Sequence, residues 1–193
     1  MLELLQEIKK CTVCSEHLDF GPRPIISGSA SSKLVIIGQA PGSVVHNTGI
    51  HWDDNSGDNL RQWLGMDNTV FYDAENVELV PMGFCYPGKG KSGDLPPRKE
   101  CAPLWHERVT KALGQVQLTL LIGSYAQAYY LGNRREGSLT ATVQNFEKYL
   151  PEYFVLPHPS PRNNIWQAKN PWFKKKGVAK DQRRSRIIGF NGQ

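Results

Sequence analysis

Apolar runs occur at four places in the chain, and segments rich in polar residues, glycine or proline separate them. The runs are 34–37, 77–80, 118–122 and 153–156, with Glu78 and Thr119 as polar exceptions. Short runs that are apolar at nearly every position are typical of strands buried on both faces, as in a parallel sheet. We therefore predict four core strands, the first beginning at Leu34.

Segments with helical spacing alternate with these strands. The predicted helices are 2–8, one with an apolar face of Leu60, Trp63 and Leu64, 102–113, 125–131 and 139–150. Ser56 and Ser124 are the expected caps of two of them, and Gly132 is the expected stop of the helix that Ser124 caps. The alternation predicts an α/β fold, a three-layer α/β/α sandwich around a central, mainly parallel four-stranded sheet.

The size and composition fit one domain. The chain has 193 residues, 39% of them hydrophobic, and we find no internal repeat or dividing linker. We predict a single domain over 1–176 and a basic, weakly structured tail over 177–193. No apolar run approaches the roughly 18 residues of a membrane span, and the first residues carry acids where a signal peptide carries bases. We expect a cytoplasmic monomer that does not bind a membrane.

The formal charge is +5, and basic residues gather late in the chain, in 174–176 and 183–186. Such a charge is compatible with an anionic partner, although a basic tail is more often a solvated end than a docking surface.

Two loops stand out because each follows a predicted strand directly. They are Gly38-Gln39-Ala40-Pro41-Gly42 and the segment 158–164, which begins His158-Pro159-Ser160-Pro161. Ligands of open α/β sheets bind at the carboxyl ends of the strands. Connecting turns also contain glycine and proline, but two such loops together favour a binding site. The glycine- and lysine-rich segment 86–94 does not have Walker spacing, so we interpret it as a surface loop.

Four cysteines form two pairs. Cys11 and Cys14 make a C-x-x-C pair, and Cys85 and Cys101 are separated by fifteen residues. In an intracellular protein this number favours a metal site over disulfides, and four thiolates suit zinc or an iron–sulfur cluster. Four free thiols are the alternative.

The two loops resemble the two motifs of the uracil-DNA glycosylase superfamily, the second in the form typical of its single-strand-selective branch. The cysteine spacing is independently similar to the cluster ligands of its iron–sulfur branches. The resemblance covers Cys11 to about Trp166. It implies a 4Fe–4S cluster as a structural element, with zinc as the second choice, and DNA with a flipped damaged base as the partner in base excision repair.

The resemblance also implies roles for individual residues. Asp54, or its neighbour Asp53, would orient water and stabilise a cationic sugar, whereas a carboxylate here can also simply favour a helix N-terminus. His158 would donate a hydrogen bond to the departing base. The implied base-binding residues are Gln39, Ala40, Trp52 and Asn55. The implied DNA-binding residues are Gly42, Ser160, Pro161, Arg162 and Asn163.

Two departures from the family pattern leave the substrate open. Ala40 stands where the best-known members carry a catalytic aspartate, and 80–85 lacks the asparagine that commonly reads the uracil edge. We expect a monofunctional glycosylase for uracil or a related base, because neither motif contains a lysine nucleophile. The alternatives are a glycosylase for another damaged or modified base, perhaps against foreign DNA, a noncatalytic DNA-damage-binding module, and a hydrolase of free nucleosides.

Overall fold

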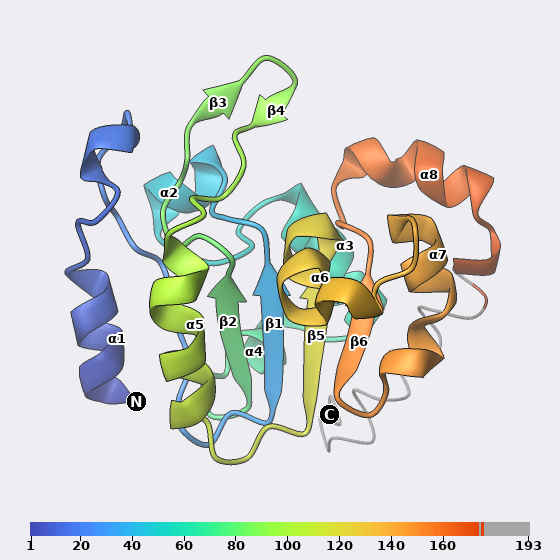
Figure 1. Ribbon diagram of the computed structural model, residues 1–193, viewed down its shortest axis with the longest axis horizontal. Helices are drawn as coiled ribbons and strands as arrows, with labels where there is room; N and C mark the ends of the chain where they lie inside the picture. The colour runs from blue at the N-terminus through green and yellow to red at the C-terminus, as the bar shows by residue number, and fades with distance from the viewer. Residues whose placement is uncertain (174, 176–193) are drawn as a thin grey trace.

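A four-stranded, all-parallel sheet forms the centre of the protein (Figure 1). The computed structural model describes residues 1–173 and 175. The strands lie in the order β2 (Val77–Pro81), β1 (Leu34–Gly38), β5 (Leu118–Ile122) and β6 (Tyr153–Leu156). Leu34 lies opposite Val77 on one side and Leu118 on the other. The predicted strands and the α/β/α fold are confirmed.

Helices cover both faces of this sheet, which explains why its strands are apolar at nearly every position. In Figure 1, α6 lies in front of the sheet and α4 behind it. The helices are α1 (Leu2–Lys9), α2 (Ser43–Thr48), α3 (Asn55–Leu64), α4 (Asn68–Phe71), α5 (Cys101–Ala112), α6 (Gly123–Leu131), α7 (Leu139–Gln144) and α8 (Asn164–Lys169). Short 3-10 turns are η1 (Ser15–His17), η2 (Gly132–Arg134), η3 (Phe146–Tyr149) and η4 (Pro161–Asn163).

One hydrophobic core joins all these layers. It runs from Leu5 in α1 to Phe173 after α8, and Ile36, Leu121 and Phe154 of the sheet are fully buried within it. The segment 174 and 176–193, which includes the predicted basic tail, lies outside the described residues. In the described part of the chain, no helix has the length and apolar character needed to span a bilayer.

Three local predictions about helices are wrong. Asp54, not Ser56, caps α3, since its carboxylate accepts the Gly57 N–H at 2.9 Å. Ser124 lies inside α6, which begins at Gly123 without a side-chain cap. The helix predicted over 139–150 stops at Gln144, and η3 follows it. Serine near a helix start is a weak signal, because a neighbouring residue in an extended conformation can take the cap position.

A two-stranded antiparallel hairpin projects beyond the carboxyl end of the sheet (Figure 1). It consists of β3 (Lys89–Gly90) and β4 (Gly93–Asp94), with Lys89 paired to Asp94. The hairpin occupies the segment interpreted above as a surface loop. Its position brings it over the strand ends that carry the two motif loops.

Glu78 is a buried acid in the middle of β2. Its side chain is fully buried, and neither carboxylate oxygen has a hydrogen-bond partner among the described residues. Gly28 makes room for it, because a Cβ at that glycine would lie 1.3 Å from Oε2. Burial raises the pKa of Glu78 to about 8.

Candidate functional site

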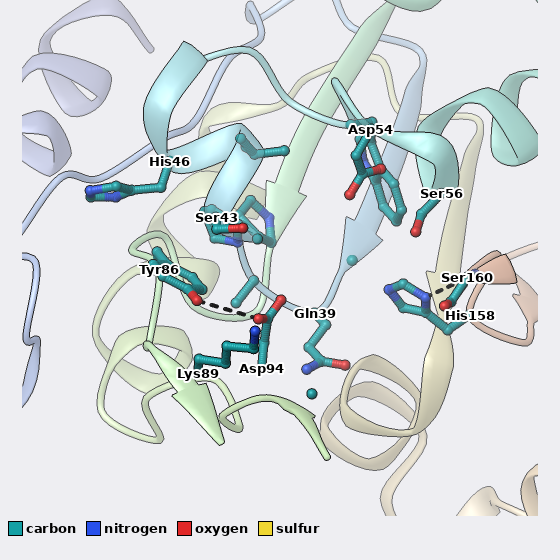
Figure 2. Close-up of a pocket in the computed structure, with 18 of the residues that line it drawn as sticks. Gln39, Ser43, His46, Asp54, Ser56, Tyr86, Lys89, Asp94, His158 and Ser160 are labelled. Carbon is teal, nitrogen blue, oxygen red and sulfur yellow. Dashed lines mark hydrogen bonds between the residues drawn. The ribbon is translucent and has the colours of Figure 1, made fainter. Parts of the chain in front are cut away.

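A cavity of about 880 Å³ lies at the carboxyl end of the sheet. Both motif loops line it, together with the segment before α3 and the β3–β4 hairpin. Figure 2 shows Asp54, Asp94 and His158 on different sides of this space. The loops that follow β1 and β6 therefore line one cavity although β5 lies between these strands, because the carboxyl ends of all parallel strands lie at the same edge of the sheet.

The first motif loop provides space for Trp52. A Cβ on Gly38 would lie 2.7 Å from the Trp52 ring, so only glycine lets that ring approach the strand end closely. Gln39 and Ala40 line the cavity beside it. The half-buried Trp52 ring lies 5.9 Å from the His158 ring, centroid to centroid, at an angle of 36°. Both rings line the cavity, so Trp52 presents an aromatic surface to it.

The backbone of Trp52 is held in a left-handed conformation, with φ of 56°. This conformation is unfavourable for a bulky residue. The Arg61 guanidinium donates to the Trp52 carbonyl oxygen at 3.2 Å, and the Tyr72 hydroxyl donates to that of His51 at 2.8 Å. A Cβ on Gly57 would lie 1.7 Å from the same Trp52 oxygen. These neighbours fix the orientation of the tryptophan.

Asp54 has two roles in the structure. It caps α3, as described above, and it also lines the cavity. Its Oδ2 atom lies 3.9 Å from the position that a Cβ on Gly42 would occupy. Asp53 and Asn55 are exposed and lie outside the cavity lining. The structure therefore brings Asp54, and not Asp53 or Asn55, toward the other predicted site residues.

His158 follows β6 and lines the cavity. Its Nδ1 atom accepts a hydrogen bond from the Ser160 N–H at 3.2 Å, so the proton of the neutral ring is on Nε2. Burial lowers the pKa of His158, while the Asp54 and Asp94 carboxylates act in the opposite direction. The site therefore favours a neutral imidazole that donates through Nε2.

The rest of the second motif loop is tied to its surroundings. The amide of Asn163 donates to the His158 carbonyl oxygen at 2.6 Å, and that of Asn59 donates to the Pro159 carbonyl oxygen at 2.9 Å. Ser160 caps η4 by accepting the Arg162 N–H at 3.3 Å. Gly42, Ser160, Arg162 and Asn163 line the cavity, whereas Pro161 is exposed outside it.

Sequence reasoning missed the hairpin as a wall of the cavity. Lys89, Ser92 and Asp94 all line this space. The Arg162 guanidinium donates to the Ser92 carbonyl oxygen at 2.8 Å and so joins the hairpin to the second motif. One signal could have indicated that the hairpin belongs to the cavity. Its segment follows β2, and β2 lies next to β1, which carries the first motif loop. Lys89 also places an amine in the cavity. The sequence did not predict one, because neither motif contains a lysine.

Three aromatic side chains, those of Phe20, His46 and Tyr86, line one side of the cavity. Their ring centroids lie 5.4 to 5.8 Å apart, and Phe20 is 61% exposed. His51 also lines the cavity, and its buried Nε2 atom has no hydrogen-bond partner in the described part of the chain. Burial lowers the pKa of His51 to about 4, so this ring is neutral at physiological pH.

The four cysteines line one small, largely apolar pocket. All are free thiols, and the Phe84 N–H donates to the Cys101 sulfur at 3.3 Å. Burial raises the pKa of Cys85 to about 11 and that of Cys101 to about 12, and charges on the other cysteines contribute to both shifts. Among residues 1–173 and 175, however, no group of three or more His, Cys, Asp or Glu side chains has the spacing of a metal site.

These features define an α/β protein with a polar ligand cavity at the ends of its parallel strands and a separate cysteine pocket. The family model described as the uracil DNA glycosylase superfamily matches residues 26–180. The protein belongs to this superfamily. The match includes both motif loops, the hairpin and the second cysteine pair, whereas Cys11 and Cys14 precede it.

Proposed function

We propose that the protein is a monofunctional DNA glycosylase that hydrolyses the N-glycosidic bond of uracil or a related damaged base. The observation that carries this proposal is the Nε2-protonated His158 beside Trp52 in the cavity, with Asp54 lining the same cavity. Cleavage of this bond puts negative charge on the departing base and positive charge on the sugar. The cavity has a group for each.

His158 stabilises the departing base. Its Nε2–H donates to a carbonyl oxygen of the base as the electron pair of the broken bond moves there. The Ser160 N–H fixes the tautomer, so the donor needs no reorientation during the reaction. A preorganised donor of this kind contributes about 3–4 kcal/mol to transition-state stabilisation.

Asp54 stabilises the sugar. As the bond breaks, C1′ of the sugar becomes cationic, and a carboxylate nearby lowers the energy of that charge. The cap hydrogen bond to Gly57 holds one Asp54 oxygen at 2.9 Å and leaves the other toward the cavity. Two requirements, a fixed position and a free oxygen, are met by one side chain.

DNA binding follows from the shape and charge of the same region. A base inside a duplex cannot be reached, so the target nucleotide must flip out and stack in the cavity, where Trp52 supplies the aromatic surface. Arg162 and Asn163 stand at the cavity lining near the end of the second motif, where they contact phosphate or the space left by the flipped nucleotide. Lys89 adds a cation for a phosphate contact.

The choice of base is a separate question. The strand-end segment 80–85 has no amide side chain, so the Gln39 amide is the cavity-lining amide placed in the first motif. A site reads a base by pairing its buried polar groups, and a different set of such groups selects a different base. Uracil is our first candidate, and another damaged or modified base is the alternative.

The test is release of free base from labelled oligonucleotides containing uracil, hypoxanthine, xanthine, oxidised pyrimidines or modified cytosines. We expect release of one base, strongly reduced in Asp54→Ala and His158→Ala and unchanged in Asp53→Ala, whose side chain is exposed outside the cavity. Retained DNA binding with no release of any base would instead support the noncatalytic module. Release from free nucleosides, without salt dependence, would support the nucleoside hydrolase.

Borohydride trapping tests the monofunctional assignment. A lyase forms an imine between an amine and C1′ of the abasic sugar, and borohydride reduces that imine to a stable adduct. We expect no adduct with wild type. An adduct that disappears in Lys89→Ala would show that the amine in the cavity is a nucleophile.

We also propose that the four cysteines hold a 4Fe–4S cluster, which places the protein nearest the iron–sulfur branches of the superfamily. The shared pocket and the absence of disulfides support this, since soft thiolates suit such a cluster. The group would serve as a structural staple between the segment before β1 and the start of α5. Iron, sulfide and zinc analysis of anaerobically purified protein, with its visible absorption spectrum, distinguishes cluster, zinc and free thiols.

The same preparation tests one further expectation. We propose that the protein acts as a monomer in the cytoplasm, and light scattering coupled to size exclusion tests the oligomeric state through the mass in solution. A mass twice that of the 21.7 kDa chain would contradict the monomer.

A further inference from the structure

We propose that Asp94, on the β3–β4 hairpin, is the general base that takes the proton of the attacking water. This inference rests on the proposed glycosylase function and assigns to its site a residue outside both motifs. Asp54 then acts as the fixed carboxylate beside the sugar. The pair divides two tasks that the sequence alone assigned to a single aspartate.

The two carboxylates both approach Gly42, at the end of the first motif loop. From the position that a Cβ on Gly42 would occupy, Asp94 Oδ2 lies 3.4 Å away and Asp54 Oδ2 lies 3.9 Å away. Both acids also act electrostatically on His158. Asp94 is therefore close to the two residues proposed to act on the sugar and on the base (Figure 2).

The two acids differ in how they are bound. Asp54 accepts a backbone N–H at 2.9 Å as the cap of α3, and protonation would weaken that hydrogen bond. Among the described residues, the Asp94 carboxylate accepts one long hydrogen bond of 3.4 Å, from the Tyr86 hydroxyl. A general base must take up a proton in each turnover, and Asp94 does so without weakening a helix cap.

The hairpin holds Asp94 in place through contacts at both ends. Arg162 donates to the Ser92 carbonyl oxygen, and a Cβ on Gly93 would lie 2.9 Å from the same guanidinium. The buried Tyr86 supplies the hydroxyl contact from the other side. The titratable and charged groups around Asp94 in the cavity are Tyr86, Lys89, Asp54, His158, His46, His51 and Arg162.

The step balances as a simple hydrolysis. The bond between C1′ and the base nitrogen breaks, and its electron pair leaves with the base. A water oxygen bonds to C1′, and the Asp94 carboxylate takes the proton that this water loses. Asp94 then releases this proton to solvent and the base anion takes one from solvent, so one water is consumed, the carboxylate is restored, and the free base and an abasic sugar are the products.

The experiment compares single-turnover rates and substrate affinity of wild type, Asp94→Ala, Asp94→Asn and Asp94→Glu on the base identified above. The chosen control is Asp53→Ala. A positioned general base contributes about 10² to 10⁴ in rate, so both Asp94→Ala and Asp94→Asn should lose at least about 100-fold with little change in affinity. Asp94→Glu should keep part of the activity.

Two readouts separate a base from a structural residue. Added formate, a small carboxylate, should restore activity to Asp94→Ala in a concentration-dependent way and should leave the control variant unchanged. The acidic limb of the pH–rate profile should become shallower in Asp94→Asn, because one titrating group has been removed.

The outcomes also separate this inference from the proposed function. If wild type releases a base and the Asp54 and His158 variants fail, but Asp94→Ala stays within about twofold of wild type, then Asp94 is not the base and the glycosylase function stands. A slow Asp94→Ala variant that formate does not restore, with an unchanged acidic limb, also overturns the inference. If wild type releases no base at all, both proposals fail.

Discussion

The two pockets of this protein are opposites. The cavity at the strand ends is large and lined by carboxylates, imidazoles, amides and a lysine, whereas the cysteine pocket is small and mainly apolar apart from its thiols, Arg98 and Glu100. In our proposal, the first pocket receives a flipped nucleotide. The second holds a compact, permanently bound group.

The difference teaches how one sheet edge supports both chemistry and stability. The loops that follow β1 and β6 build one side of the cavity, while the chain between Cys85 and Cys101 links the cysteine pocket to the hairpin on the other side. Changes in the cavity should therefore alter rate, and changes in the cysteine pocket should alter stability. The predictions below test this division.

The largest effect is expected for His158→Ala. Loss of a preorganised donor to the departing base should lower the single-turnover rate about 10²- to 10³-fold. The melting temperature should change little, since the ring faces the cavity. Rapid-quench kinetics and thermal unfolding of the same preparation give both quantities. A rate within twofold of wild type would remove His158 from the site.

The opposite pattern, reduced stability with a nearly unchanged rate, is expected for Cys101→Ser. The sulfur accepts the Phe84 N–H, and a hydroxyl in this largely buried position is a poorer ligand for iron or zinc. We expect the free energy of unfolding to fall by about 1–3 kcal/mol and bound metal to be lost. The rate per folded molecule should stay within about twofold. A stable variant that still binds metal would contradict the proposed stabilising role of the bound group.

A pH-dependent loss of stability is expected from Glu78, which lies in neither pocket. Its pKa of about 8 in the folded protein exceeds the ordinary value of 4.5, so the folded form holds a proton that the unfolded chain releases. Stability from this group is therefore present at low pH and is lost as pH rises from about 4.5 to about 8, by up to about 1.4 kcal/mol per pH unit.

Glu78→Gln should abolish this loss, and denaturant unfolding of both proteins from pH 5 to 8 measures it. The buried His51 and His106, with pKa values lowered to about 4, destabilise the fold in the other direction, as pH falls below about 6.5. The difference between wild type and variant isolates Glu78. Parallel curves for the two proteins would contradict an uncharged, buried Glu78.

The smallest effect is expected for Lys89→Ala. Loss of one phosphate contact should weaken DNA binding by a uniform factor across sequences and reduce the slope of log affinity against log salt by about 1. Fluorescence anisotropy at several salt concentrations measures this slope. Lys91→Ala, at the neighbouring position outside the cavity lining, is the matched control. Equal slopes in all three proteins would exclude a phosphate contact at Lys89.

Much of this protein could be predicted from its sequence, because the signals are local. The run 34–37 is apolar at every position, and such a run is stable only between two covered faces. The Gly38-to-Gly42 loop follows it directly, so its place at the sheet edge follows from the strand. Helix caps were harder, since Asp54 and Ser56 both suit the start of α3, and only the backbone conformation, extended at Asp54, distinguishes them.

The sequence alone determined the strands, the two motif loops and the two cysteine pairs along the chain, because each depends on residues close together in the chain. Only the tertiary structure decided that Asp94 and Lys89 belong to the cavity and that Asp53 does not. These depend on contacts between distant segments, such as the hydrogen bond from Arg162 to Ser92. Whether such long-range contacts form depends on how the whole sheet packs, and no local pattern of residue types predicts that packing.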